Sequence, residues 1–313
     1  MTDFYNYAKP NLINNLCDKL DIPQEIKETV LQLIRQGEIN KAEPHFSGLF
    51  DPETAHNSSI AIEKLFSEYP EGSPTSNHCF APRASQSASE TFGYMTVLLI
   101  ASIKVYEIYK EKEIDTSIYY DTMSFFKTVL DRDLAFYGKY SFTDTAFWYY
   151  REIAGLIYKL GVLEYEMLYA DEYNAKTFDI PFGAPMLSVH IPFRAKLNRK
   201  NLNDSYAMVK PFFRKHFPQY ENATVTCGTW LLSPELKGLL PQNSNILEFQ
   251  SDYKIIKTDK SNGNCFMFLF GNPDKDIEYK NLPEDTSLRK AAKQHLINGG
   301  TIGTGTGVCI NIH

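Results

Sequence analysis

The sequence predicts an α+β protein, with an all-helical N-terminal domain at residues 1–142 and a mixed α/β sheet domain at residues 143–313. Two observations lead to this division. Up to about residue 140, apolar residues recur at steps of three and four, which is the period of an amphipathic helix. From Val162 onwards, several segments alternate between apolar and polar residues, as half-buried strands do. A chain of 313 residues is long enough for each domain to bury its own core.

Four segments of the N-terminal domain have the pattern of helices. The clearest begins at Pro23 and ends before Gly37, a proline and a glycine placed as at many helix ends. The other three are residues 58–69, 90–112 and 116–131. Residues 90–112 are mostly apolar, so we expect this helix at the centre of the helical domain. Residues 70–82, rich in Pro, Ser and Asn, are predicted to form a loop.

The sheet domain is expected to begin with a connecting helix at residues 144–160, capped by Thr143 or Asp144 and stopped by Gly161. The expected strands are 162–169, 186–192, 223–232, 246–257, 264–270 and 308–312, and the expected helices are 203–216 and 285–297. The first two strands could form a hairpin, and the turn at 259–263 suits another. This order predicts a mixed α+β sheet and not a regular βαβ array.

Composition and charge exclude several classes of protein. The net charge of −6 argues against a nucleic-acid partner, which would need a clustered positive field. The most basic stretch, residues 194–200, is interpreted as a solvated turn, with an anion site as the alternative. The N-terminus lacks the pattern of a secretory signal, and the most apolar window, 95–103, is too short to span a bilayer. Five widely spaced cysteines without a CxxC pair indicate reduced thiols. We therefore expect a cytoplasmic protein with no membrane partner and no metal site.

Short distinctive segments are distributed along the chain between about residues 115 and 308. They lie at residues 148–151, 158–166, 190–192, 217–218, 230–236, 240–249 and 282–288, with Gly155 between the first two. Together they resemble a family that pairs an N-terminal helical acyltransferase-associated domain with a GNAT-like C-terminal domain. The expected C-terminal fold is thus a GNAT-like mixed sheet.

The resemblance implies a reaction as well as a fold. An acyl group would pass from acyl-CoA or acetyl-CoA, as co-substrate, to an amine of a small molecule or peptide, directly and with general-base assistance. The helical domain would shape the acceptor site, and the ligand cleft is expected between the domains or at the sheet's split. The alternative is a non-catalytic GNAT-like ligand-binding module that has lost the pyrophosphate loop. A hydrolase that uses Cys227 or His190 is a third possibility.

Three residues are candidates for catalysis. His190 is the candidate base, because it lies on the polar face of an expected strand and the ordinary pKa of histidine is near neutrality; a structural histidine is the alternative. Glu164 shares a strand face with Glu166, so one of them could orient His190 or act as the base, although a solvated face explains both equally well. Cys227 could be a thiol nucleophile with His190 as partner, or a buried structural cysteine.

Candidates for binding lie on either side of these residues. On the connecting helix, Trp148, Arg151, Gly155 and Lys159 would share one face. Arg151 could then hold donor phosphates with Lys159, or this face could pack on the sheet. Trp148 and Tyr158 are the candidates for substrate binding.

Trp230, Thr286 and Ser287 are the remaining binding candidates. Trp230 could stack on an adenine, line an acyl tunnel or anchor the core. GNAT enzymes place a glycine-containing Q/R-x-x-G-x-G/A turn before a helix N-terminus, and the comparable segment, 271–287, lacks it. Its helix begins with two carboxylates that would repel an anion, so Thr286 and Ser287 are the remaining cofactor contacts there. Residues 299–307 are glycine-rich but precede a strand, so a flexible turn is expected.

Overall fold

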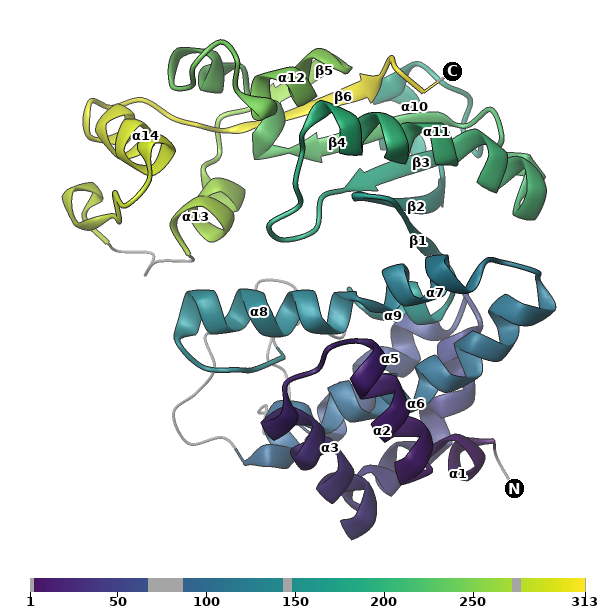
Figure 1. Ribbon diagram of the computed structural model, residues 1–313. Coiled ribbons are helices and arrows are strands. Elements are labelled where there is room, and N and C mark those ends of the chain that lie inside the picture. The colour runs from purple at the N-terminus through teal and green to yellow at the C-terminus, as the bar shows by residue number, and fades with distance from the viewer. Residues whose placement is uncertain (1–2, 67–86, 143–147, 272–276, 313) are drawn as a thin grey trace. The chain divides into compact units, whose positions relative to one another are not determined.

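The computed structural model describes residues 3–66, 87–142, 148–271 and 277–312 (Figure 1). The chain divides into two compact units, Met1–Tyr158 and Lys159–His313. The first is helical, and the second is built on a mixed sheet, so the predicted α+β class is confirmed. Residues 148–158, which follow the boundary expected after residue 142, lie in the helical unit.

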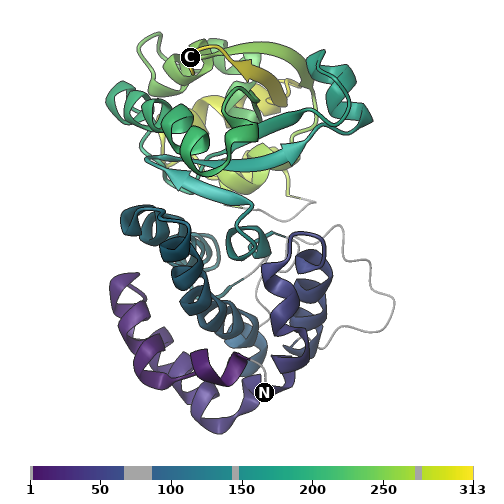
Figure 2. The same ribbon diagram turned by 90° about the vertical axis from the view of Figure 1, so that its right-hand side faces the viewer.

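Helices form nearly all the regular structure described in the first unit (Figure 2). They are α1 (Phe4–Tyr7), α2 (Pro10–Lys19), α3 (Gln24–Gln36), α4 (Glu43–Phe46), α5 (Ala55–Phe66), α6 (Ala88–Glu111), α7 (Thr116–Met123), α8 (Phe125–Tyr137) and α9 (Tyr150–Ile153), with the 3-10 turns η1 (Glu38–Ala42) and η2 (Ser47–Phe50). In α3, the buried Ile26, Val30 and Ile34 recur every four residues. Gly37, with a φ of 72°, ends the helix, which confirms that prediction.

Helix α6 lies at the centre of the helical unit, where it packs against α2, α3, α5 and α7. A capping box starts it: the Ser87 hydroxyl accepts from the Glu90 N–H, and the Glu90 carboxylate accepts from the Ser87 N–H. By length and composition α6 could cross a bilayer, but 67% of its most apolar 18-residue window is buried inside the protein. This burial is typical of the central core helix that the sequence predicted.

Two predictions for the helical unit need correction. The helix expected at 116–131 is two helices, α7 and α8, because the chain turns at Ser124, whose hydroxyl donates to the Asp121 carbonyl at 2.6 Å. The helix expected at 58–69 begins earlier, at Ala55. Residues 67–69, together with the loop expected at 70–82, lie outside the described residues.

The prediction of a connecting helix at residues 144–160 is wrong. The described part of this segment holds only α9, and the chain then enters strand β1 (Ile157–Leu160). Gly155 has a φ of 68°, in the left-handed region that ends helices, and the Leu156 N–H bonds back to the Arg151 carbonyl at 2.8 Å. Residues 143–147, with the two N-caps expected there, lie outside the described residues.

Among the described residues, six strands form one sheet in the order β1-β2-β3-β4-β6-β5 (Figure 1). After β1 these are β2 (Leu163–Tyr169), β3 (Pro185–His190), β4 (Thr224–Thr229), β5 (Tyr253–Asp259) and β6 (Thr304–Cys309). β3 and β4 are parallel, whereas the pairs β2–β3, β4–β6 and β5–β6 are antiparallel. The expected hairpin of the first two strands is thus confirmed as β2–β3, and the sheet is mixed.

The elements that connect the strands include one long helix. They are α10 (Glu172–Phe178), α11 (Arg199–His216), α12 (Asn245–Ser251), α13 (Gly263–Phe270) and α14 (Ser287–Ile297), with the 3-10 turns η3 (Pro218–Tyr220), η4 (Trp230–Leu232), η5 (Pro234–Gly238) and η6 (Tyr279–Asn281). In α11, the buried Leu202, Tyr206, Val209 and Phe213 recur at steps of three and four, as predicted, but the helix begins at Arg199 and not at the expected residue 203. The Ser205 hydroxyl of α11 lies 3.1 Å from the Tyr165 hydroxyl of β2, so α11 covers the sheet face that carries Tyr165.

Three predictions for the sheet unit are wrong in part or in full. The strand expected at 246–257 starts as α12, capped by the Ser244 hydroxyl, and only then becomes β5. The strand expected at 264–270 is α13, because a short, uniformly apolar run has no period that separates strand from helix. The hairpin expected across 259–263 is therefore absent, and β5 pairs with β6.

The glycine-rich segment 299–307, expected as a turn, instead supplies residues 304–307 of β6, so the strand expected at 308–312 begins earlier and ends at Cys309. Gly305 and Gly307 lie within the strand, where a Cβ on Gly305 would collide with the Leu232 carbonyl oxygen. A Cβ on Gly307 would lie 2.8 Å from the Lys254 carbonyl oxygen. These glycines therefore allow close backbone approach inside the sheet.

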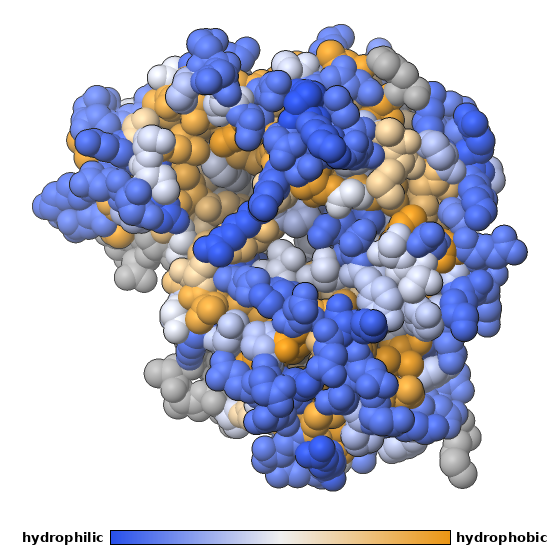
Figure 3. Space-filling view, viewed as in Figure 1, coloured by the Kyte–Doolittle hydropathy of each residue, from blue (hydrophilic) through white to orange (hydrophobic). Residues whose placement is uncertain are grey.

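The surface of the sheet unit exposes some large apolar side chains. Phe268, Tyr279 and Ile297 are exposed on α13, η6 and α14, and an apolar area lies over this region in Figure 3. Single exposed apolar residues are ordinary on protein surfaces.

Candidate functional site

A histidine–glutamate pair lies on one face of the β2–β3 hairpin. The register places Glu164 opposite His190 and Glu166 opposite Ser188. The His190 Nε2 lies 2.8 Å from Glu166 Oε2, with 22% of the histidine side chain and 9% of the glutamate side chain exposed. This face is the one opposite Tyr165, so it is turned away from α11. The structure thus brings His190 together with both carboxylates considered for it.

Of the two glutamates, Glu166 is the one that forms a hydrogen bond with His190. An ionised Glu166 can only accept a hydrogen bond, so this contact favours the tautomer of His190 that carries its hydrogen on Nε2 and its lone pair on Nδ1. Alternation along the strand placed both glutamates on one face, but it did not reveal which of them reaches His190. The register sets Glu164 directly across from His190, so the contact with Glu166 depends on the conformation of the His190 side chain.

Glu164, directly across from His190, has a perturbed pKa. Burial raises the pKa of Glu164 above its ordinary value of 4.5, while Lys159 and His190 partly offset the increase. The folded protein therefore binds this proton more tightly than the unfolded chain does. Between pH 4.5 and the raised pKa, the free energy of unfolding contributed by Glu164 should fall as the pH rises.

We expect Glu164→Gln to remove this contribution, because glutamine does not titrate. Urea unfolding of the wild type and the variant at a series of pH values above 4.5 measures it. The variant should show a less negative slope of unfolding free energy against pH. Identical slopes would contradict the raised pKa.

The parallel strands β3 and β4 part at their carboxyl ends, close to this pair. Their ladder runs from Met186–Thr224 to Ser188–Thr226. Beyond it, β3 continues to His190, whereas β4 continues to Thr229 in partnership with β6. The sheet thus has a split at the end of β3, and ligands of open α/β sheets bind beyond the carboxyl ends of such strands.

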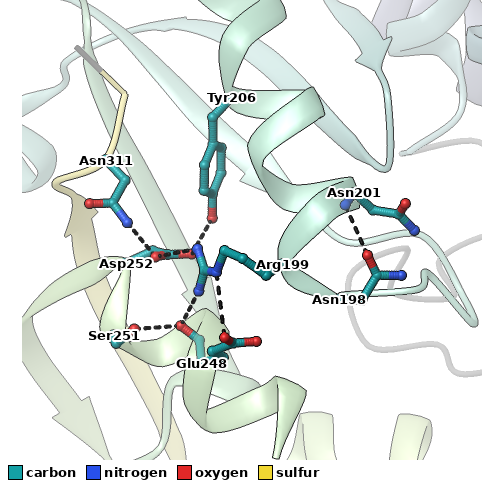
Figure 4. Close-up of polar contacts among 8 residues, drawn as sticks. All are labelled: Asn198, Arg199, Asn201, Tyr206, Glu248, Ser251, Asp252 and Asn311. Atoms are coloured by element: carbon teal, nitrogen blue, oxygen red, sulfur yellow. Dashed lines mark hydrogen bonds and ion pairs between the residues drawn. The ribbon is translucent and has the colours of Figure 1, made fainter.

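A basic loop, residues 191–198, leads from the split to the N-terminus of α11. Arg194 and Lys196 are exposed within it. The Asn198 side chain caps the helix by accepting from the Asn201 N–H at 2.9 Å (Figure 4). The other N–H groups of the first turn have no acceptor within the helix, and the helix dipole is positive there. A strand, a basic loop and a long helix N-terminus together favour an anion.

An anion site in this basic stretch was the alternative interpretation of the sequence, and it was not connected with the donor phosphates. Its basic composition and Asn198 were the available signals, but the stretch was interpreted as a solvated turn. The segment considered instead, 271–287, follows the helix α13 and not a strand. Thr286 is the N-cap of α14, where its hydroxyl accepts from the Arg289 N–H at 3.1 Å, and Ser287 is the first residue of that helix. Their assignment to cofactor binding stays a prediction.

Cys227 and Trp230 are buried in the sheet unit. Burial raises the pKa of the Cys227 thiol well above its ordinary value, and Cys309 adds to the effect. A thiol with a raised pKa forms little of the thiolate that a nucleophile needs, so the position suits a structural cysteine. Trp230 begins the η4 turn after β4 and does not lie in the expected strand.

The remaining candidates belong to the helical unit. The Arg151 guanidinium stacks on the rings of Trp148 and Tyr150, 4.6 Å and 5.0 Å from their centroids, and donates to the Trp148 carbonyl at 3.3 Å. Tyr158 is buried beside Tyr109, with ring centroids 5.6 Å apart. The single helical face that would have joined Trp148 to Lys159 does not exist, because the chain changes from helix to strand at Gly155. Roles of Arg151, Trp148 and Tyr158 in binding stay predictions.

Comparison with known proteins gives the same two-part division. Residues 11–155 match the N-acyltransferase N-terminal domain, and residues 157–309 match the GNAT-like C-terminal domain. No curated protein matches the chain.

Solved acyltransferase structures have a similar fold. One in complex with decanoyl-CoA has a TM-score of 0.73 at 20% identity, over 96% of this chain and 87% of that chain. Another, in complex with decanoyl-CoA and teicoplanin, has a TM-score of 0.72 at 19% identity over the same shares, 96% and 87%. The resemblance in the sequence is confirmed: the chain belongs to the family that joins an N-acyltransferase N-terminal domain to a GNAT-like C-terminal domain.

Proposed function

We propose that the protein transfers an acyl group from an acyl-CoA thioester directly to an amine of a small molecule or peptide, with His190 as the general base. The observation that carries the proposal is the 2.8 Å contact between His190 and Glu166 at the split of β3 and β4. Membership of an acyltransferase family supports the reaction type. The similar solved acyltransferases, which bind decanoyl-CoA or CoA, support the donor.

The proposed reaction needs one proton acceptor and no covalent intermediate on the protein. The amine nitrogen attacks the thioester carbonyl carbon, a C–N bond forms, and the C–S bond breaks. His190 accepts the proton that the amine loses. The departing thiolate takes up a proton and leaves as CoA. Glu166 stabilises the imidazolium that forms, because its carboxylate lies 2.8 Å from the ring nitrogen.

The donor phosphates would lie at the loop 191–198 and the first turn of α11. Arg194 and Lys196 supply positive charge there, and the helix N-terminus supplies N–H groups. The loop contains no glycine, so it departs from the glycine-containing turn of GNAT enzymes. Basic side chains would therefore contribute more of the phosphate binding than in a glycine-rich cradle.

The acceptor is assigned only by its chemical class. One similar solved acyltransferase contains teicoplanin beside decanoyl-CoA. This supports an acceptor of the small-molecule or peptide type, as the resemblance implied. The acyl group carried to it would come from the CoA thioester bound at the loop 191–198.

Binding of CoA, acetyl-CoA and decanoyl-CoA, measured by thermal shift and calorimetry, tests the donor. A ligand that binds only the folded protein stabilises it by about 2.7 kcal/mol at 100 times its Kd. We expect stabilisation by CoA and by its thioesters, and weaker binding at higher salt.

Charge variants locate the donor site. Arg194→Ala and Lys196→Ala should weaken CoA binding, whereas Lys215→Ala, which removes the same charge near the end of α11, should not. Equal effects of all three would remove the loop from the proposal. No response to CoA or any thioester would overturn acyl transfer and favour the non-catalytic ligand-binding module.

A further inference from the structure

A buried carboxylate joins three distant segments of the sheet unit beneath the start of α11. Asp252, between α12 and β5, is 1% exposed at its side chain. It accepts from Arg199 at 2.8 and 2.9 Å, from the Tyr206 hydroxyl at 3.0 Å and from the Asn311 amide (Figure 4). Its own carbonyl accepts from the Ile310 N–H at 2.8 Å. The first two turns of α11, the start of β5 and the segment after β6 therefore meet at one side chain.

The Arg199 guanidinium is held in this cluster by hydrogen bonds. It is the first residue of α11, directly after the basic loop. Besides its two bonds to Asp252, its guanidinium donates to the Glu248 carbonyl at 2.9 Å. A guanidinium at a helix N-terminus is unfavourable for the helix dipole, and the buried carboxylate offsets that charge. Arg199 thus contributes a fixed position and not a free cation.

We propose that Asp252 is a positioning residue for the donor site, which holds the first turn of α11 through Arg199 so that its N–H groups and the preceding loop meet the CoA phosphates. This inference rests on the proposed function. Asp252 acts through Arg199 and Tyr206, which approach it from the first two turns of the helix.

Asp252 could affect CoA binding through its negative charge or through its hold on Arg199, and these two explanations predict opposite effects of Asp252→Asn. If only charge mattered, Asp252→Asn would remove a negative charge near an anion site and tighten CoA binding. If position matters, the variant loosens the two Arg199 bonds and weakens CoA binding. The sign of the change in Kd therefore separates the two explanations.

The experiment measures the Kd of CoA by calorimetry and the Tm without ligand, for wild type, Asp252→Asn and Arg199→Lys. Lysine keeps the charge but has a single nitrogen, so it cannot contact Asp252 and the Glu248 carbonyl at once, as Nη1 and Nη2 of Arg199 do. We expect CoA to bind about 10-fold more weakly to both variants, which corresponds to about 1.4 kcal/mol. With decanoyl-CoA and an amine acceptor, KM for the donor should rise while kcat changes little. If Asp252→Asn fails to fold, Tyr206→Phe takes its place. This variant loses one hydrogen bond to Asp252 and no charge, and we expect it to weaken CoA binding as well.

Asp204→Asn is the matched control. Asp204 pairs with Lys200 at 2.6 Å on the exposed side of the same helix, and its substitution also removes one negative charge. It should leave CoA binding equal or tighter. If the wild type binds CoA and Asp252→Asn binds equally or more tightly, or loses only Tm, the positioning role is overturned. A wild type that does not bind CoA would overturn the proposed function, and this inference with it.

Discussion

Replacing His190 by alanine should lower the rate of acyl transfer by about 10²–10⁴-fold, the usual contribution of a positioned general base. The alanine variant cannot accept the amine proton, but it keeps the loop and the helix proposed to bind the donor. Thiol release from decanoyl-CoA in the presence of an amine measures the rate, and calorimetry with CoA checks that donor binding persists. A rate unchanged from wild type would remove His190 from the mechanism.

Two further variants separate the roles around His190. Glu166→Gln keeps a polar side chain but cannot stabilise the imidazolium, so we expect a smaller loss than in His190→Ala. Cys227→Ala should leave turnover close to wild type, because the buried thiol has a strongly raised pKa. A loss in Cys227→Ala equal to that in His190→Ala would restore the hydrolase possibility that depends on this thiol.

Asp133→Ala should destabilise the helical unit by about 3–5 kcal/mol, the usual cost of removing one member of a buried ion pair. Asp133 on α8 is fully buried, and Arg132, 7% exposed, donates to it at 2.8 and 2.9 Å. The Ser141 hydroxyl donates to the other carboxylate oxygen at 2.8 Å. The substitution leaves the Arg132 guanidinium in the interior without the carboxylate beside it. Urea unfolding followed by circular dichroism measures the loss.

The neighbouring aspartate on α8 is the control. Asp131 pairs with Lys127 one turn earlier at 2.6 Å, and its side chain is 36% exposed. Removal of this exposed pair by Asp131→Ala should cost only about 0.2–0.5 kcal/mol. Similar losses in the two variants would show that the buried pair contributes no more than a surface one.

The strongly periodic segments could be predicted from the sequence, and the ambiguous ones could not. Helices α3 and α11 each bury a regular set of apolar residues. Helix α6 buries residues 92–102 without a period, and the length of its apolar segment predicted it instead. The run 264–270 is apolar at nearly every position, so its helix has no sequence period to reveal it. Residues 144–160 have a helical spacing of apolar residues, but the left-handed Gly155 interrupts it.

The candidate site was only partly predictable, because it depends on pairing between strands. Alternation placed His190 on a polar face, and it grouped Glu164 with Glu166. Pairing of β2 with β3 brings both glutamates close to His190, and the conformation of the histidine side chain, which contacts Glu166 across the diagonal, is visible only in the structure. The loop 191–198 precedes the long helix that returns to a parallel strand, a position that sequence order alone did not show. The placement of the His190–Glu166 pair and of the loop 191–198 therefore depends on tertiary structure and not on local sequence pattern.

The order of the strands in space has a consequence for assembly of the sheet during synthesis. β6 is the last strand in the sequence, yet it lies between β4 and β5. β5 pairs only with β6 in this sheet of the described residues, so it cannot join the other strands until residues 304–309 have been made. Such pairing between segments distant in sequence forms late and slowly. On the ribosome, the helical unit can therefore fold well before the sheet is complete, and residues 253–259 lack their strand partner until residues 304–309 emerge.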